Sequence, residues 1–197
     1  MSLKCFFITA CSLLFSSLAL SQDLWQLKKD QNGIKIWKAS THEFSFKIYK
    51  AETTIAGDLE EVKSALMNLD NIALFKEGIS EISEVQWIAE NEVQFICNPT
   101  LTINTTPILL KRRYAPVEVG SYEINTTVVP HNTEGKEPIH TNKYFSLWIL
   151  INAGSGTTFV KHIISNNPSE RNPDWMYQLR AVSQIFTGIE NLKRIVE

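Results

Sequence analysis

The sequence predicts an α+β domain in which a curved antiparallel β-sheet is wrapped around a long C-terminal α-helix. Apolar residues recur every three or four positions near the C-terminus, as an amphipathic helix requires: Trp175, Leu179, Val182, Phe186, Ile189, Leu192 and Val196. Several β-rich segments precede them without the crossover helices that parallel strands need, so these strands pair antiparallel. The apolar face of the helix must be buried against this sheet, and we therefore expect the sheet to bend around it.

The first elements of the domain are predicted to be a helical piece, a turn and two strands. Apolar residues at 24–27 indicate a short helix, and the polar residues 30–33 supply a turn before a β-branched strand at 34–37. A second strand is expected over roughly 44–55. Apolar residues lie on both of its faces, so its register stays open, and a bulge near Ile48 would explain the pattern.

A helix and then a run of strands follow. Gly57 breaks the second strand, and Asp58 can cap a helix whose buried face is formed by Leu59, Val62, Leu66 and Leu69. Further strands are expected at 82–88, 93–97, 101–103, within 112–129, and at 143–151 and 157–165. The polar tract 131–141 is predicted to be a surface loop, and 152–156 a hairpin connection. The terminal helix is expected from about Pro173, which suits a first turn, to Val196.

The N-terminus predicts export from the cytoplasm. Lys4 precedes an uncharged apolar run at 5–20 that is too short to span a membrane comfortably, and small residues follow at the expected cleavage point. We expect a signal peptide at 1–21, cleavage after Ser21, and a periplasmic or secreted domain at 22–197. Lipoprotein processing at Cys11 is the alternative, although the apolar run continues well beyond that cysteine.

Composition excludes several classes of function. The leader holds one charge, so the remaining 176 residues carry 18 basic and 21 acidic side chains, a formal charge of −3. Nucleic acid is therefore not an expected partner. Cys97 is the single cysteine outside the leader, which rules out an internal disulfide in the processed chain. We expect a soluble monomer with at most transient membrane contact.

The C-terminal part of the chain resembles the end of a START (StAR-related lipid-transfer) domain. The order is a Trp-containing strand at 143–148, a Gly-Thr hairpin and strand at 154–162, Asn167-Pro168, and the helix start Pro173-Asp174-Trp175. The segments 33–37, 49–53 and 59–69 are similar to the opening of secreted bacterial members of this helix-grip superfamily. In the middle, the basic run 111–114 resembles a strand start of the family. The resemblance implies a helix-grip fold with a tunnel between sheet and terminal helix, and binding of a lipid or other apolar molecule.

Seven residues are candidates for lining such a cavity. Large aromatic side chains offer wide apolar contact, and Tyr or Trp adds one polar group. The candidates are Tyr144, Trp148, Phe95, Phe159, Trp175, His162 and Arg113. The alternative for each aromatic residue is ordinary core packing, and for His162 a histidine satisfied within the sheet. Arg113 is expected to reach inward because strand alternation separates it from Arg112.

Other chemistry has less support in the sequence. The basic run Lys111-Arg112-Arg113 is shorter than the clusters that bind anionic lipids. We therefore interpret it as the solvated or ion-paired end of a strand. His131 and His140 lack a third metal ligand at a characteristic spacing, and Cys97 reads as a small buried hydrophobic residue. We find no hydrolase, metalloprotease or phosphate-loop motif. No catalytic residue, metal or cofactor is therefore assigned.

Three functions remain open from the sequence. A carrier that binds a lipid or other apolar molecule without chemistry is favoured. A cyclase- or aromatase-like enzyme would use the same cavity, with acid and base groups drawn from His162, Tyr144 and Arg113. An interaction domain would have that cavity filled by side chains.

Overall fold

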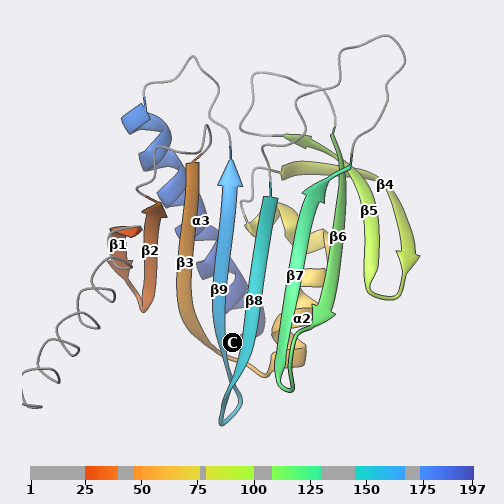
Figure 1. Ribbon diagram of the computed structural model, residues 1–197, viewed down its shortest axis with the longest axis horizontal. Coiled ribbons are helices and arrows are strands. Elements are labelled where there is room, and N and C mark those ends of the chain that lie inside the picture. The colour runs from red at the N-terminus through yellow and green to blue at the C-terminus, as the bar shows by residue number, and fades with distance from the viewer. Residues whose placement is uncertain (1–24, 40–46, 76–78, 100–107, 130–144, 167–173) are drawn as a thin grey trace, which may run out of the picture.

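The computed structural model describes residues 25–39, 47–75, 79–99, 108–129, 145–166 and 174–197 (Figure 1). The elements in these ranges are β1 (Trp25–Gln31), β2 (Ile34–Ala39), β3 (Lys47–Ala56), α2 (Leu59–Met67), the 3-10 helix η1 (Leu69–Phe75), β4 (Ile79–Ala89), β5 (Glu92–Pro99), β6 (Ile108–Pro116), β7 (Ser121–Val128), β8 (Phe145–Gly154), β9 (Thr157–Asn166) and α3 (Asp174–Val196). The strands form one nine-stranded sheet in the order β1-β2-β3-β9-β8-β7-β6-β5-β4. Every neighbouring pair is antiparallel. The predicted α+β class, with a curved antiparallel sheet and a long terminal helix, is confirmed.

The chain begins with a strand where the sequence predicted a helix. Trp25 pairs with Ala39, and β1 and β2 form a hairpin joined by Asn32 and Gly33. Both turn residues have positive φ, 53° and 70°, which is the geometry of a tight hairpin whose twist matches that of its strands. The prediction of a helix at 24–27 is therefore wrong, because pairing with β2 overrides a weak local helical pattern.

The open register of β3 is settled by its pairing with β9. The two strands pair without interruption from Lys47 opposite Asn166 to Ala56 opposite Thr157, so there is no bulge at Ile48 and that expectation is wrong. The buried side chains of β3 are Tyr49, Ala51, Thr53 and Ile55. These alternate residues face α3, and the apolar side chain of Ile48 lies on the other face of the sheet.

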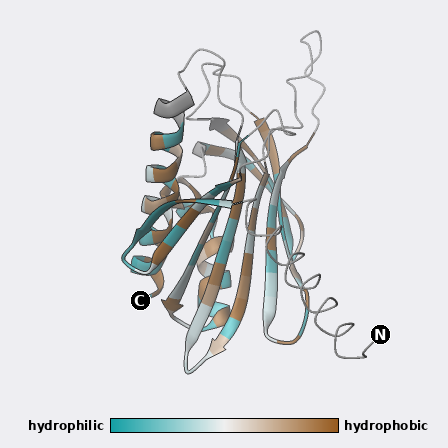
Figure 2. Ribbon diagram, turned by 60° about the vertical axis from the view of Figure 1, so that its left-hand side comes forward, coloured by the Kyte–Doolittle hydropathy of each residue, from teal (hydrophilic) through white to brown (hydrophobic). Residues whose placement is uncertain are grey.

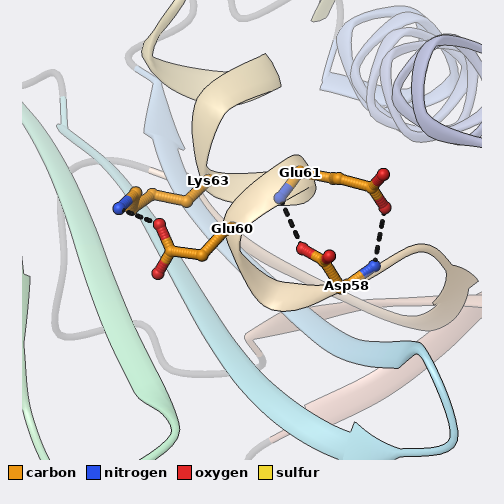
Figure 3. A network of polar contacts seen from close by, with 4 residues as sticks. All are labelled: Asp58, Glu60, Glu61 and Lys63. Atoms are coloured by element: carbon orange, nitrogen blue, oxygen red, sulfur yellow. Dashed lines mark hydrogen bonds and ion pairs between the residues drawn. The ribbon is translucent and has the colours of Figure 1, made fainter.

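Helix α2 starts at the predicted cap. The Asp58 carboxylate accepts a hydrogen bond from the Glu61 backbone N–H at 2.8 Å, and the Glu61 carboxylate accepts one from the Asp58 N–H at 2.9 Å (Figure 3). This reciprocal capping box satisfies two backbone donors that a helix start leaves open. Val62 and Leu66 are fully buried, as their spacing predicted.

Helices α2 and α3 lie on the same side of the sheet, which we call the inner face (Figures 1 and 2). Helix α3 is 23 residues long and contacts η1, α2, β3 and β2. Among its residues from 178 onward, the buried apolar ones are Ile185, Phe186, Ile189 and Leu192. At Gly188 a Cβ would lie 2.0 Å from the Phe75 carbonyl oxygen, so only glycine permits this approach of α3 to η1.

Several predicted segments lie outside the described residues. They are the leader at 1–21, the strand at 101–103 and the loop at 131–141. Within the described residues, the helices are too short or too polar to span a bilayer.

Candidate ligand-binding site

Polar side chains are buried in the middle of the otherwise apolar inner face. They are Tyr49, Arg112, Thr126, Ser146 and His162, and none has more than 2% of its surface exposed. Cross-strand pairing places Arg112 beside Thr126 and Thr126 beside Ser146. A row of polar groups therefore crosses β6, β7 and β8. Buried polar atoms are costly unless they form hydrogen bonds, so such a row calls for a specific account.

His162 is held by a hydroxyl and by aromatic rings. Its Nε2 lies 3.0 Å from the Ser146 Oγ. The Trp148 ring stacks on the imidazole with centroids 3.7 Å apart and planes 4° from parallel, and the Phe75 ring meets Trp148 edge-on at 6.1 Å. The stack fixes the orientation of the imidazole. A hydroxyl and an imidazole at this position can each donate or accept a hydrogen bond, depending on the histidine tautomer.

Arg112 joins the sheet to α2. Its Nε donates to the Thr126 hydroxyl at 2.8 Å, and its Nη1 donates to the Leu66 carbonyl at 2.7 Å. Leu66 lies in the last turn of α2, where carbonyls have no intrahelical partner, so the guanidinium caps the helix end. Arg113 is exposed on the opposite, outer face. The expectation that Arg113 reaches inward is therefore wrong: the alternation was right, but it turns Arg112 inward.

The predicted aromatic residues divide between the two faces. Trp148 and Phe95 are both fully buried on the inner face, three strands apart in the sheet order. Phe159 is half-buried and faces outward, where it pairs with the exposed residues Thr54 and Ile151. Phe159 is thereby removed from the predicted lining, because it lies one residue from the inward positions of β9.

Two predicted lining residues, Tyr144 and the side chain of Trp175, lie outside what the structure describes, as do His131 and His140. The structure also adds residues that the sequence reasoning missed: Tyr49, Arg112, Thr126 and Ser146. Ser146 carried a usable signal, because it precedes Trp148 by two residues on a predicted strand and must share its face.

A second polar cluster lies between α2 and strands β6 and β7. Lys63 pairs with Glu60 (Figure 3), and its Nζ lies 5.0 Å from the Tyr114 ring centroid and 4.6 Å from that of Tyr122. The hydrogen bond from Lys63 lowers the pKa of Glu60. Burial, the largest single influence, lowers the pKa of Lys63, but the hydrogen bond to Glu60 and the charges of Glu60, Tyr122 and Tyr114 together raise it above its usual value. The charge of Lys63 is thus balanced by Glu60 and contacts two tyrosine rings, and these contacts hold α2 against the sheet.

Cys97 is buried on the inner face of β5. Desolvation raises the pKa of its thiol to about 12, so the thiolate that a nucleophile needs is absent at neutral pH. Across the described ranges, no three His, Cys, Asp or Glu side chains converge as metal ligands would.

A small pocket opens between η1 and the end of α3. Its volume is about 250 Å³, and its lining residues are Leu74, Asn191, Arg194 and Ile195. None of these belongs to the predicted lining. Asn191 also donates from its side chain to the Leu74 carbonyl at 2.7 Å, which ties α3 to η1.

Comparison with known proteins identifies the fold. No family model matches the chain. A relative, an uncharacterized protein of Pseudomonas aeruginosa, is 22% identical over 91% of this chain and 89% of its own length.

Solved structures are more informative. Human StAR-related lipid transfer protein 5 superimposes with a TM-score of 0.69 and 16% identity, covering 95% of this chain and 94% of that one. A StAR-related lipid transfer protein from Xanthomonas axonopodis superimposes with a TM-score of 0.67 and 16% identity, covering 87% of this chain and 98% of that one. A Streptomyces aromatase/cyclase superimposes with a TM-score of 0.52 and 8% identity, covering 76% of this chain and 94% of that one. The chain thus has the helix-grip fold. In particular, it has the START-like form of that fold.

Proposed function

We propose that this protein binds a lipid or another apolar small molecule between the inner face of the sheet and α3, and carries it without chemical change. The observation that carries the proposal is the row of polar groups set in the apolar inner face of a START-like fold. The likeness to two StAR-related lipid transfer proteins supports the same ligand class.

The packing of α3 is consistent with a ligand beneath its first half. Among the side chains of the helix that the structure describes, which begin at 178, the buried residues fall within 185–192, while 178–184 are half-buried or exposed, and Leu179 is 64% exposed. An apolar molecule under this half of α3 would remove further apolar surface from water. Covering about 400 Å² at about 25 cal/mol per Å² gives roughly 10 kcal/mol of gross stabilisation. An association cost of about 4 kcal/mol would leave roughly 6 kcal/mol, which corresponds to a dissociation constant of about 40 µM.

The polar groups would orient the ligand. In this proposal the hydroxyl or carbonyl end of the molecule meets Ser146 and His162, which lie 3.0 Å apart and can exchange one mutual hydrogen bond for bonds to the ligand. The Trp148 ring provides the apolar wall next to them. Arg112 keeps α2 in place above the row through its bond to Leu66.

Binding of fluorescent fatty acid and phospholipid probes to delipidated protein tests this function. Trp148→Ala should weaken binding of the favoured probe at least tenfold, whereas Phe159→Ala, an aromatic truncation on the outer face, should leave it unchanged. Trp148→Phe keeps an aromatic ring and serves as the conservative variant in case Trp148→Ala does not fold. Circular dichroism checks that each variant is folded. Equal affinity for the wild type and for folded Trp148→Ala would refute a site at Trp148.

A cyclase-like enzyme is the second candidate. The Ser146–His162 pair favours it because an imidazole beside a hydroxyl can move protons on a bound substrate, and an aromatase/cyclase shares the fold. Under this alternative, the molecule extracted from the protein would be converted on incubation with wild type and would stay unchanged with His162→Asn. Recovery of one unaltered molecule from both proteins favours the carrier.

Export remains a proposal that rests on the sequence of the first 21 residues. The chain would be synthesised with the leader and released after Ser21, so that the protein begins at Gln22. Intact-mass analysis of protein from its native cells tests this. A mass that still includes the leader would contradict it.

A further inference from the structure

The two edges of the sheet differ in the side chains they expose. Strand β4 forms one edge and β1 the other, at opposite ends of the molecule in Figure 1. On β4, three large apolar residues are about half exposed: Val85 at 48%, Trp87 at 53% and Ile88 at 48%. Apolar side chains exposed on the last strand of a sheet are unusual, since edge strands are normally protected from association.

The β4–β5 hairpin, residues 79–99, is also acidic. It contains Glu81, Glu84, Glu90 and Glu92 and no lysine or arginine. Glu92 lies 3.9 Å from Lys111, but Glu84 and Glu90 form no ion pair with any other described residue. A partner for this edge should therefore offer apolar side chains beside positive charges.

A surface of that kind exists on the other edge of the same sheet. The β1–β2 hairpin, residues 25–39, contains Lys28, Lys29, Lys35 and Lys38 against a single acid, Asp30. Leu27 is 51% exposed on β1. The weak pair Lys35–Asp30 spans 4.0 Å, and Lys28 forms no ion pair with the rest of the described chain.

We propose that the β4–β5 hairpin of one copy binds the β1–β2 hairpin of a second copy, in a head-to-tail association. The β4–β5 hairpin carries a formal charge of −4 and the β1–β2 hairpin one of +3. They attract across this contact mainly through Lys28 and Lys35, since Lys29 lies over the Phe186 ring of α3 and Lys38 bonds to Gln178 of the same helix. Contact between two like edges would be repulsive. Leu27 of one copy then covers apolar surface at Val85, Trp87 and Ile88 of the other. Because the two patches differ, a head-to-tail dimer leaves one edge of each kind free, and chains can grow.

Side chains, not a continuous main-chain ladder, make this contact. The pairing of β1 shifts between Leu27 and Lys29, and that of β4 shifts at three places along the strand. Such bulges interrupt regular addition of a strand. The contact is therefore small, and its dissociation constant should be on the order of 100 µM at low salt. The monomer expected from the sequence is then the state at low concentration.

Sedimentation velocity on the wild-type protein gives the first test. In low salt, the weight-average sedimentation coefficient should rise between about 10 µM and 1 mM protein. Because exposed charges are screened, about 0.5 M salt should weaken the apparent association at least tenfold. A coefficient that stays at the monomer value over the whole range would overturn the proposal, as would association that is unaffected by salt.

Two variants, one with the charge of the β4–β5 hairpin removed and one with the charge of the β1–β2 hairpin reversed, test the head-to-tail geometry. Glu84→Lys/Glu90→Lys should not associate with itself, because its β4–β5 hairpin no longer carries a net negative charge. Lys28→Glu/Lys35→Glu should not associate with itself either, because both of its hairpins are then negative. Mixed together they should form a dimer with wild-type affinity, since the first keeps a native β1 edge and the second a native β4 edge. Glu118→Lys, at the exposed β6–β7 turn, is the matched control and should behave as wild type. Failure of the mixture to associate, with both variants folded, would overturn the proposal.

Discussion

The indole of Trp148 lies flat against the imidazole of His162, with 3.7 Å between the ring centroids and 4° between the planes. The two residues are direct cross-strand partners on β8 and β9. A face-to-face stack of this kind leaves the edge of the imidazole for hydrogen bonds, and Ser146 occupies one of its nitrogens. The inner face thus presents an oriented polar group next to a large apolar wall, which is what a site for an amphipathic molecule needs.

Adjacent arginines should differ sharply in their effect on stability. Arg112→Ala removes a buried cation that bonds to Thr126 and to the end of α2, and we expect a loss of about 3 kcal/mol in the free energy of unfolding. Arg113→Ala, on the exposed face, should change it by less than about 0.5 kcal/mol. Urea denaturation measures both. Similar losses for the two variants would contradict the assignment of faces.

Gly188→Ala should destabilise the protein although alanine is the better helix former. In an unconstrained helix the change stabilises by about 1 kcal/mol. Here the new Cβ would lie 2.0 Å from the Phe75 carbonyl oxygen, so α3 must shift, and we expect a net loss of about 2 kcal/mol. Ser183→Ala, at an exposed position of the same helix, is the control. A gain in the melting temperature of Gly188→Ala would show that α3 does not approach η1 this closely.

The capping box of α2 should contribute measurably to the free energy of unfolding. Asp58→Ala removes one acceptor of the capping box and is expected to cost about 1 kcal/mol in chemical unfolding. Glu61→Gln keeps an acceptor at the same position and should cost less. If the two substitutions have the same effect, the reciprocal bonds drawn in Figure 3 do not contribute as described.

Cys97 should resist alkylation until the protein unfolds. With its pKa raised from 9.0 to about 12, the thiolate fraction at pH 8 falls roughly 1,000-fold, and the labelling rate with it. The same shift makes stability fall as pH rises above about 9, because the unfolded thiol then loses a proton that the folded one keeps. Mass spectrometry of the Cys97 peptide after iodoacetamide treatment, with and without urea, measures the protection. Rapid labelling of the native protein would contradict burial of this thiol.

Long periodic elements were predictable from the sequence, and residues whose role depends on a partner were not. Helix α3 and the cap at Asp58 follow from local patterns that the fold preserves. Strand β1 was missed because its conformation depends on pairing with β2, which a local pattern at 24–27 does not contain.

The candidate site shows the same division. Trp148 and His162 were identified by residue type, and strand alternation alone places Ser146 with Trp148. The choice between Arg112 and Arg113 required the register of β6, because alternation separates the two residues without saying which one faces α2. Phe159 was misplaced for the same reason.

Native mass spectrometry of the protein purified from its own cells tests the central claim most directly. We predict a species heavier than the polypeptide by one small molecule, which organic solvent releases and which Trp148→Ala retains poorly. If repeated preparations, and protein incubated with lipid mixtures, show only the mass of the bare chain, the inner face is a closed core and the proposed carrier function is wrong.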